Sequence, residues 1–107
     1  MASDQDFVDF VIDQIKNVGE ITSKKMFGEY GLYADGKLFG LICDNKLFIK
    51  PTISGRAFIG NASEESPYDG AKPSFLINEK IDDTTWLSEL IRISLLELPL
   101  PKLKKST

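Results

Sequence analysis

Two tight turns in the first half of the chain restrict its fold more than any other feature of the sequence. The dipeptides Asp35-Gly36 and Asp44-Asn45 each separate two apolar segments. Asp, Asn and Gly tolerate the positive φ angles of a type I′ turn, whose twist matches that of the antiparallel strands it joins. The strands predicted around these turns cover residues 21–26, 32–34, 37–43 and 46–50. The sequence therefore predicts an antiparallel meander, which Pro51 ends.

Helix signals lie on both sides of this meander. Apolar side chains recur at helical spacing near the start of the chain, at Phe7, Val8, Val11, Ile12 and Ile15. They predict a helix over residues 4–17, and a short helix is predicted over 54–59. The cluster Asp82-Asp83-Thr84-Thr85 predicts the N-cap of a last helix, which ends before Pro99 and is apolar on most sides.

These elements predict one α+β domain with helices at both ends of an antiparallel sheet. Residues 61–73 are rich in Ser, Glu, Gly and Pro and are predicted to form a loop, and residues 74–77 a further strand. The predicted order is α-β-β-β-β-α-β-α. A single domain is expected over residues 1–107, with an ordered core over about 4–98 and a basic tail over 99–107.

Both faces of the predicted meander are apolar. The two turns place one set of side chains on the first face: Leu32, Phe39, Leu41 and Phe48, with Lys37, Lys46 and Lys50 near its ends. They place another set on the second face: Tyr33, Leu38, Ile42, Leu47 and Ile49. An antiparallel sheet with one wet face shows a clean alternation of apolar and polar residues, and this one does not. Helices can cover one face, so the other needs a further element or a second copy of the chain.

The composition argues against several classes of function. The net charge is −3, whereas a broad nucleic-acid-binding face carries a cationic excess, so direct nucleic-acid binding is not expected. The chain has no histidine and one cysteine, Cys43, which removes the commonest general base and leaves too few ligands for a Cys/His zinc site. We therefore expect no enzyme activity, no metal and no cofactor. The N-terminus lacks the pattern of a signal peptide and no apolar stretch could span a bilayer, so the expected location is the cytoplasm.

Two segments contain candidate binding residues. Lys24, Lys25, Phe27 and Tyr30 precede or lie within a glycine-punctuated stretch, and they form either an anion-contacting edge or a charged edge strand followed by a bulge. In the second segment, Tyr68 and Lys72 lie between two prolines and beside Gly70. These residues could form a recognition edge, or they could order the loop before the next strand.

Other reactive groups have simpler interpretations. Cys43 lies at a strand end, where we expect a small buried apolar residue with Lys46 as its cross-strand neighbour. The carboxylate pairs Glu64-Glu65 and Asp82-Asp83 are expected to lie in a solvated loop and at a helix start.

The sequence resembles the signature of the TfoX N-terminal domain family. The resemblance rests on residues 25–33, on 35–39, and on 68–73, where many family members have proline in place of Asp69. It implies an α+β fold similar to that of secretion chaperones and YjbR-like proteins, which often dimerise. The family includes regulators of natural competence that assist transcription at promoters controlled by the cyclic-AMP receptor protein. Such regulators have a second, C-terminal domain, and this chain resembles a stand-alone N-terminal domain.

Two functions are expected from these observations together. The first is a non-enzymatic protein-binding or regulatory domain, which the resemblance links to transcriptional regulation of competence-type genes. Its partner would be another protein or a second copy of the chain in a homodimer, and no membrane is involved. The alternative is a small-ligand or anion-binding domain that uses five of the candidate residues: Lys24, Lys25, Tyr30, Tyr68 and Lys72.

Overall fold

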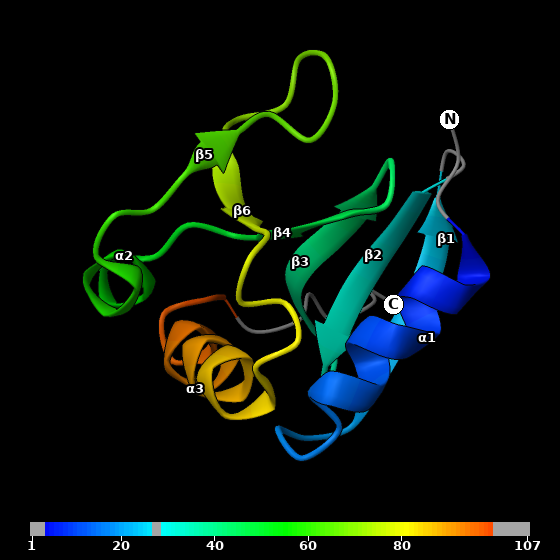
Figure 1. Cartoon of the computed structure of the whole chain (residues 1–107), viewed down its shortest axis with the longest axis horizontal. Helices are drawn as coiled ribbons and strands as arrows, with labels where there is room; N and C mark the ends of the chain where they lie inside the picture. The colour runs from blue at the N-terminus through cyan, green and yellow to red at the C-terminus, as the bar shows by residue number, and fades with distance from the viewer. Residues whose placement is uncertain (1–3, 27–28, 100–107) are drawn as a thin grey trace, which may run out of the picture.

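The computed structural model describes residues 4–26 and 29–99. In order along the chain, its elements are α1 (Gln5–Gln14), β1 (Ile21–Met26), β2 (Glu29–Ala34), β3 (Lys37–Cys43), β4 (Lys46–Ile49), α2 (Ile53–Ile59), β5 (Glu64–Glu65), β6 (Ser74–Ile77) and α3 (Thr84–Leu95) (Figure 1). The predicted α+β class and element order are confirmed. The structure adds β5, a strand of two residues within the segment predicted as a loop. Phe27, Gly28 and residues 100–107 of the predicted tail lie outside the described residues.

One antiparallel sheet contains all the strands of the described residues, in the order β1-β2-β3-β4-β6-β5. The two turns predicted from the sequence join β2 to β3 and β3 to β4. Asp35 and Gly36 have φ angles of 50° and 88°, and Asp44 and Asn45 have φ angles of 53° and 56°. These positive values are those that a two-residue type I′ connection requires. The turns therefore fix the meander as expected.

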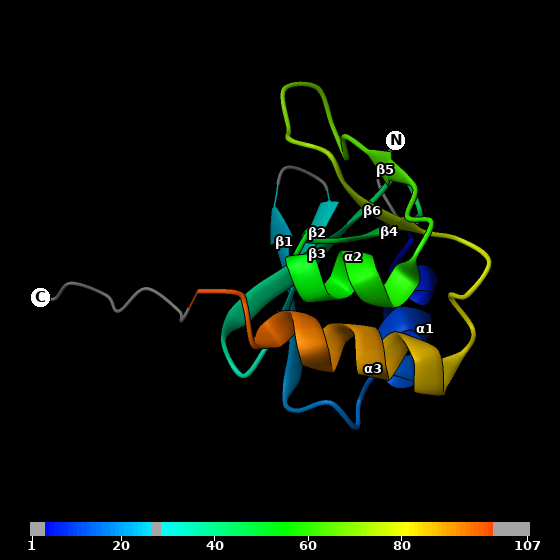
Figure 2. The same cartoon turned by 90° about the vertical axis from the view of Figure 1, so that its left-hand side faces the viewer.

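The helices pack on one face of the sheet, as Figure 2 shows. Val8 and Val11 of α1, and Ile15 directly after it, join the same buried cluster as side chains of α3 and of the strands. The fully buried members of this core from the strands and from α3 are Leu32, Phe39, Ile42, Leu47, Ile49, Phe75, Leu87, Leu90 and Ile91. The short helix α2 lies on the same side, because a Cβ atom at Gly55 would be only 3.1 Å from the Phe75 ring and from the Ser94 hydroxyl.

A β-bulge determines which strand residues reach this core. The pairing of β2 with β3 shifts between Leu32 and Tyr33, so that Leu32 pairs with Gly40 and Tyr33 with Leu38, and Phe39 is the extra residue. Phe39 is fully buried within the core. The prediction that Leu32 and Phe39 share a face with Leu41 is therefore wrong, because the extra residue changes the alternation of side chains along β3.

The same shift reverses two further predictions. Tyr33 and Leu38 were predicted on the face of Ile42, Leu47 and Ile49. They lie on the opposite face, together with Leu41, because they precede the extra residue and Ile42 follows it. The conclusion that both faces are apolar still holds, with a different set of residues on each face.

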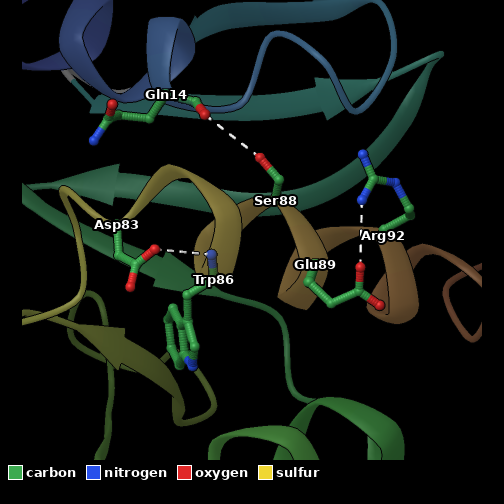
Figure 3. Close-up of polar contacts among 6 residues, drawn as sticks. All are labelled: Gln14, Asp83, Trp86, Ser88, Glu89 and Arg92. Carbon is green, nitrogen blue, oxygen red and sulfur yellow. Dashed lines mark hydrogen bonds and ion pairs between the residues drawn. The ribbon is translucent and has the colours of Figure 1, made fainter.

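Polar contacts join α3 to its neighbours. Asp83 is its N-cap, and the carboxylate oxygen Oδ1 accepts a hydrogen bond of 3.0 Å from the Trp86 backbone, as the N-cap prediction requires (Figure 3). The Ser88 hydroxyl donates to the carbonyl oxygen of Gln14 in α1 over 3.4 Å. At the other end, the Thr52 hydroxyl donates to the Ser94 hydroxyl over 3.4 Å. Helix α3 therefore contacts α1 on one side and the start of α2 on another, as expected for a helix that is apolar on most sides.

Candidate functional site

The sheet face that points away from the helices is the main candidate site. We call it the open face, and its apolar members are Tyr33, Leu38, Leu41, Cys43, Phe48 and Leu76. Cys43 and Phe48 are buried but do not belong to the core cluster. The other four side chains are partly exposed. No helix of the described residues covers this face, as the view in Figure 2 makes clear.

The strand register arranges the open face in rows. Lys24, Gly31, Leu41, Phe48 and Leu76 are successive cross-strand neighbours from β1 to β6. Such neighbours on one face are close enough for their side chains to interact. The centre of the row is therefore apolar, and a lysine lies at its β1 end.

A groove of about 430 Å³ borders this face, and we call it the β3–loop groove. Strand β3 contributes Leu38 and Leu41, and Lys50 follows β4. The loop before β6 contributes the remaining main contacts, which include Pro67, Tyr68, Lys72 and Pro73. The lining is mostly apolar, and Lys50 and Lys72 are its charged members among the described residues. This combination suits a ligand that has both apolar and anionic groups.

Hydrogen bonds within the loop hold the loop side of the groove in shape. The Ser66 hydroxyl donates to the Ala71 carbonyl oxygen over 2.8 Å, and the Ala71 amide donates to the Tyr68 carbonyl oxygen over 3.0 Å. Gly70 has a φ of 88°, in the left-handed region that favours glycine. The side chain of Tyr68 is 60% exposed at this turn. The loop thus presents an aromatic ring on a backbone that is already ordered.

The structure brings together only part of the candidate set from the sequence. Tyr68 and Lys72 both line the β3–loop groove. Lys24 and Lys25 are exposed on β1 and are not among the groove's lining residues. They also point to opposite sides of the sheet, because Lys24 pairs with Gly31 and Lys25 with Tyr30.

Two other candidates have a different status. Tyr30 is buried on the helix side, where its hydroxyl donates to the Gln5 side chain of α1 over 3.2 Å. This contact joins the first helix to β2, so the tyrosine has a clear part in the fold. Phe27 lies outside the described residues.

The sequence analysis did not select Leu38, Leu41 and Lys50 as site residues. Each was assigned to a strand or its end, but the groove becomes visible only once the loop before β6 is placed beside β3.

Cys43 has the properties of a buried apolar residue. Lys46 is its cross-strand partner, as predicted. Burial raises the pKa of its thiol to about 11, and the negative charges of Glu29 and Asp44 add to this shift. A thiol with such a pKa is almost wholly protonated at neutral pH, so it is a poor nucleophile.

The acidic residues form structural contacts. Glu64 forms an ion pair with Arg56, whose guanidinium also lies 5.3 Å from the centre of the Phe75 ring.

Within residues 4–26 and 29–99, no group of three His, Cys, Asp or Glu side chains could hold a metal ion. None of the helices in that same part of the chain is long and apolar enough to cross a membrane.

A second hollow, of about 370 Å³, lies between the end of α2, β6 and the start of α3. Trp86 lines it, with the Phe58 ring centre 5.5 Å away and the Lys80 ammonium 5.9 Å from the indole centre. Its other lining residues are mixed in polarity and include Asn61, Ser63 and Asn78. The hollow shares no lining residue with the β3–loop groove.

The fold and the open face together define a class of protein: a small α+β domain in which helices cover one face of an antiparallel sheet. Comparison with known proteins identifies the class more closely. The family model described as the TfoX N-terminal domain matches residues 13–98, and the chain belongs to this family. It is a family of regulatory type and not an enzyme family.

A curated relative extends the similarity over almost the whole chain. It is described as an uncharacterized 12.7 kDa protein in the trpE 5′ region of Spirochaeta aurantia. The two sequences are 37% identical over 106 residues, which cover 99% of this chain and 92% of the relative. The similarity therefore includes both the strands of the open face and the loop that borders it.

Proposed function

We propose that this domain acts without catalysis, by binding another protein through its open face, and that this binding serves a regulatory process. The observation that carries the proposal is that no helix of the described residues covers the apolar side chains of the open face. Contiguous apolar surface on a small domain commonly marks an interaction site. Membership of a regulatory family supports the same conclusion.

The regulated process that fits this family is the transcription of competence-type genes in the cytoplasm. The chain would act there through protein contacts, because its net charge of −3 does not favour a broad contact with nucleic acid. RNA sequencing of a strain that lacks the gene should show altered transcript levels. Unchanged transcripts under competence-inducing conditions would rule out this process.

Copurification of a partner from the native host tests the use of the open face. The full chain should retain a specific partner, and Leu38→Asp and Leu41→Asp should each lose it, because a carboxylate cannot be buried in an apolar contact without a large cost. Phe10→Asp is the matched control, since Phe10 is an exposed apolar residue of α1 on the helix side. Retention of the partner by both open-face variants would contradict the proposal.

The homodimer expected from the sequence is a competing use of the same face. Size-exclusion chromatography with light scattering measures it directly. A monomeric mass at high protein concentration would mean that the open face does not self-associate and that its partner is a different protein. A dimeric mass that Leu41→Asp converts to a monomeric one would assign the face to self-association.

A small anion is the second candidate ligand, because the structure places Tyr68 and Lys72 in one groove with Lys50. Two lysines in a groove that Tyr68 also lines could bind a phosphate or a carboxylate. Titration with inorganic phosphate, monitored by amide chemical shifts, tests this function. Shifts that saturate at residues of the β3–loop groove would support it, and a lack of shifts would exclude it.

A further inference from the structure

We propose that the β3–loop groove binds an acidic segment of the partner protein that includes a bulky apolar side chain. This inference rests on the proposed function, since it names the chemistry of the partner at the open face. In this proposal, the apolar side chain of the segment packs in the part of the groove formed by β3. The acidic side chains of the segment contact Lys50 and Lys72.

The apolar part of the groove has a suitable size and composition. Leu38 and Leu41 of β3 line it together with two prolines of the loop, Pro67 and Pro73. Its volume of about 430 Å³ lies within the range of roughly 300–1,000 Å³ typical of ligand-binding pockets. A leucine or phenylalanine in this position would bury apolar surface that is exposed in the free protein, which favours association.

The charged part of the groove determines which sign of charge is favoured on the partner. Lys50 and Lys72 line the groove, and no carboxylate does so among the described residues. Glu65 and Asp69 lie nearby in the chain, but neither is a lining residue. Opposite charge on the partner speeds encounter and excludes wrong partners, whereas like charge is repelled. The groove therefore discriminates in favour of acidic segments, although the chain as a whole is acidic.

The same charges make a second copy of the chain a poorer occupant. A copy that presents its own open face also presents its own Lys50 and Lys72, so association of two open faces concentrates positive charge. An acidic partner removes this repulsion.

The order of the loop lowers the entropic cost of binding. Hydrogen bonds from Ser66 to Ala71 and from Ala71 to Tyr68 already fix the turn. Tyr68 is exposed on this turn, and tyrosine supplies a large contact area with few side-chain rotations to immobilise. A preformed wall means that less conformational freedom is lost when the partner binds.

Amide chemical shifts of the isotope-labelled full chain, titrated with synthetic peptides, test the proposal. The probe is a peptide of about ten residues with two central leucines flanked by glutamates. One matched peptide has lysines in place of the glutamates, and another has serines in place of the leucines. We expect saturable shifts at residues 38–41, at Lys50 and at 67–74 with the first peptide, and far smaller ones with the two matched peptides.

Charge reversal provides the matched pair of variants. Lys50→Glu combined with Lys72→Glu should weaken binding of the acidic peptide about tenfold, from the loss of two exposed ion pairs. Lys16→Glu combined with Lys80→Glu changes the net charge by the same amount at lysines outside the groove. This control should bind the acidic peptide within about twofold of the unmodified chain. Thermal unfolding of each variant establishes that it is folded.

Four results would overturn the inference. The lysine peptide could bind as well as the acidic peptide, or the shifts could centre on the hollow beside Trp86. Inorganic phosphate alone could produce the same shifts, which would identify a small-anion site. Groove shifts that depend on protein concentration without any peptide would identify a second copy as the occupant.

The failure of this inference can be distinguished from the failure of the proposed function. If the acidic peptide does not bind but Leu41→Asp still abolishes copurification of a partner, the open face binds a protein of different chemistry. If Leu41→Asp has no effect on copurification, the open face itself is the wrong assignment.

Discussion

At the scale of single residues, close contacts between strands determine which side chains are tolerated. A Cβ atom at Gly40 would lie 2.5 Å from the Phe48 carbonyl oxygen and 3.2 Å from the Ile49 side chain. The nearer atom belongs to the backbone of β4, so it cannot move aside without breaking the strand pairing. Glycine at this position therefore allows β3 and β4 to approach each other next to the bulge at Phe39.

Cys43 gives a testable consequence of burial at this scale. Alkylation by iodoacetamide requires the thiolate, and with the pKa raised from 9.0 to about 11 the thiolate fraction at pH 8 falls about 100-fold. We expect slow labelling of the folded protein, with a rate that rises about tenfold per pH unit below pH 11. Mass spectrometry of quenched samples measures the rate.

The pH dependence of stability follows from the same shift. Because the pKa of the folded thiol is raised, its contribution to the free energy of unfolding is complete below pH 9 and is lost as the pH rises towards about 11.

Glu29→Gln should accelerate labelling of Cys43 only moderately, since burial is the larger cause of the pKa shift. Labelling at pH 8 as fast in the folded as in the urea-unfolded protein would refute this description of Cys43.

At the scale of elements, the short helix α2 depends on the chain that follows α3. The Glu97 carboxylate accepts hydrogen bonds from the amides of Ile53 and Ser54 over 2.9 and 2.7 Å. The Thr52 hydroxyl accepts another from Gly55 over 2.9 Å. These contacts satisfy backbone amides at the helix start that have no partner within the helix. The hydrogen bonds from Ser54, and to a smaller extent the one from the Ile53 amide, lower the pKa of Glu97.

Replacement of Glu97 by Gln should therefore lower the midpoint of thermal unfolding at pH 7. The stabilisation is present above the ordinary pKa of 4.5 and is lost as the pH falls through the depressed pKa of the folded state. The difference between the two proteins should accordingly decrease in acid. Calorimetry at several pH values measures it.

Glu89→Gln is the control for this variant. Glu89 pairs with Arg92 over 3.3 Å (Figure 3), and both side chains are about half exposed. Such pairs contribute little to stability. An equal effect of the two substitutions, or a difference that does not change with pH, would argue against the role of Glu97 at the start of α2.

The elements differ in how far the sequence predicts them. The turns at residues 35–36 and 44–45 and the N-cap at Asp83 are set by local backbone preferences, and each prediction is confirmed. The two-residue strand β5 is formed by pairing with β6, a contact that local propensity does not encode. The bulge at Phe39 was also missed. Gly40 was its available signal, because a lone glycine within a strand pattern often marks a bulge.

At the scale of the whole molecule, the two faces of the sheet have different functions. Leu47 points into the core, whereas Leu41, which precedes Leu47's cross-strand partner Ile42, lies on the open face. Leu41→Asp should change the free energy of unfolding by no more than about 1 kcal/mol, because the partly exposed side chain can keep its carboxylate in water. Leu47→Asp should cost more than about 4 kcal/mol or prevent folding, because it buries an unpaired charge.

Urea unfolding monitored by circular dichroism compares the two variants under the same conditions. Similar losses of stability in both would mean that the open face is part of the folding core. The comparison also provides the folding control for the binding experiments with Leu41→Asp.

Only a few of the residues that line the β3–loop groove were candidates from the sequence. Tyr68 and Lys72 were recognised because prolines and a glycine frame them, and the structure places both in one groove. Lys24 and Lys25 were grouped with them by charge alone, but adjacent residues of a strand point to opposite sides. Leu38, Leu41 and Lys50 depend on how β3 and the loop before β6 meet in space, which no local pattern reveals.

The alternation along β3 and β4 has a consequence for how such a domain could change its partner. Residues that hold the fold and residues that face outward follow one another in the same strands, so each set can vary without the other. Selection could therefore alter Leu38, Leu41 and Lys50 while Ile42, Leu47 and Ile49 stay constant. A library randomised at the outward positions alone would be a practical way to evolve new specificities on an unchanged scaffold.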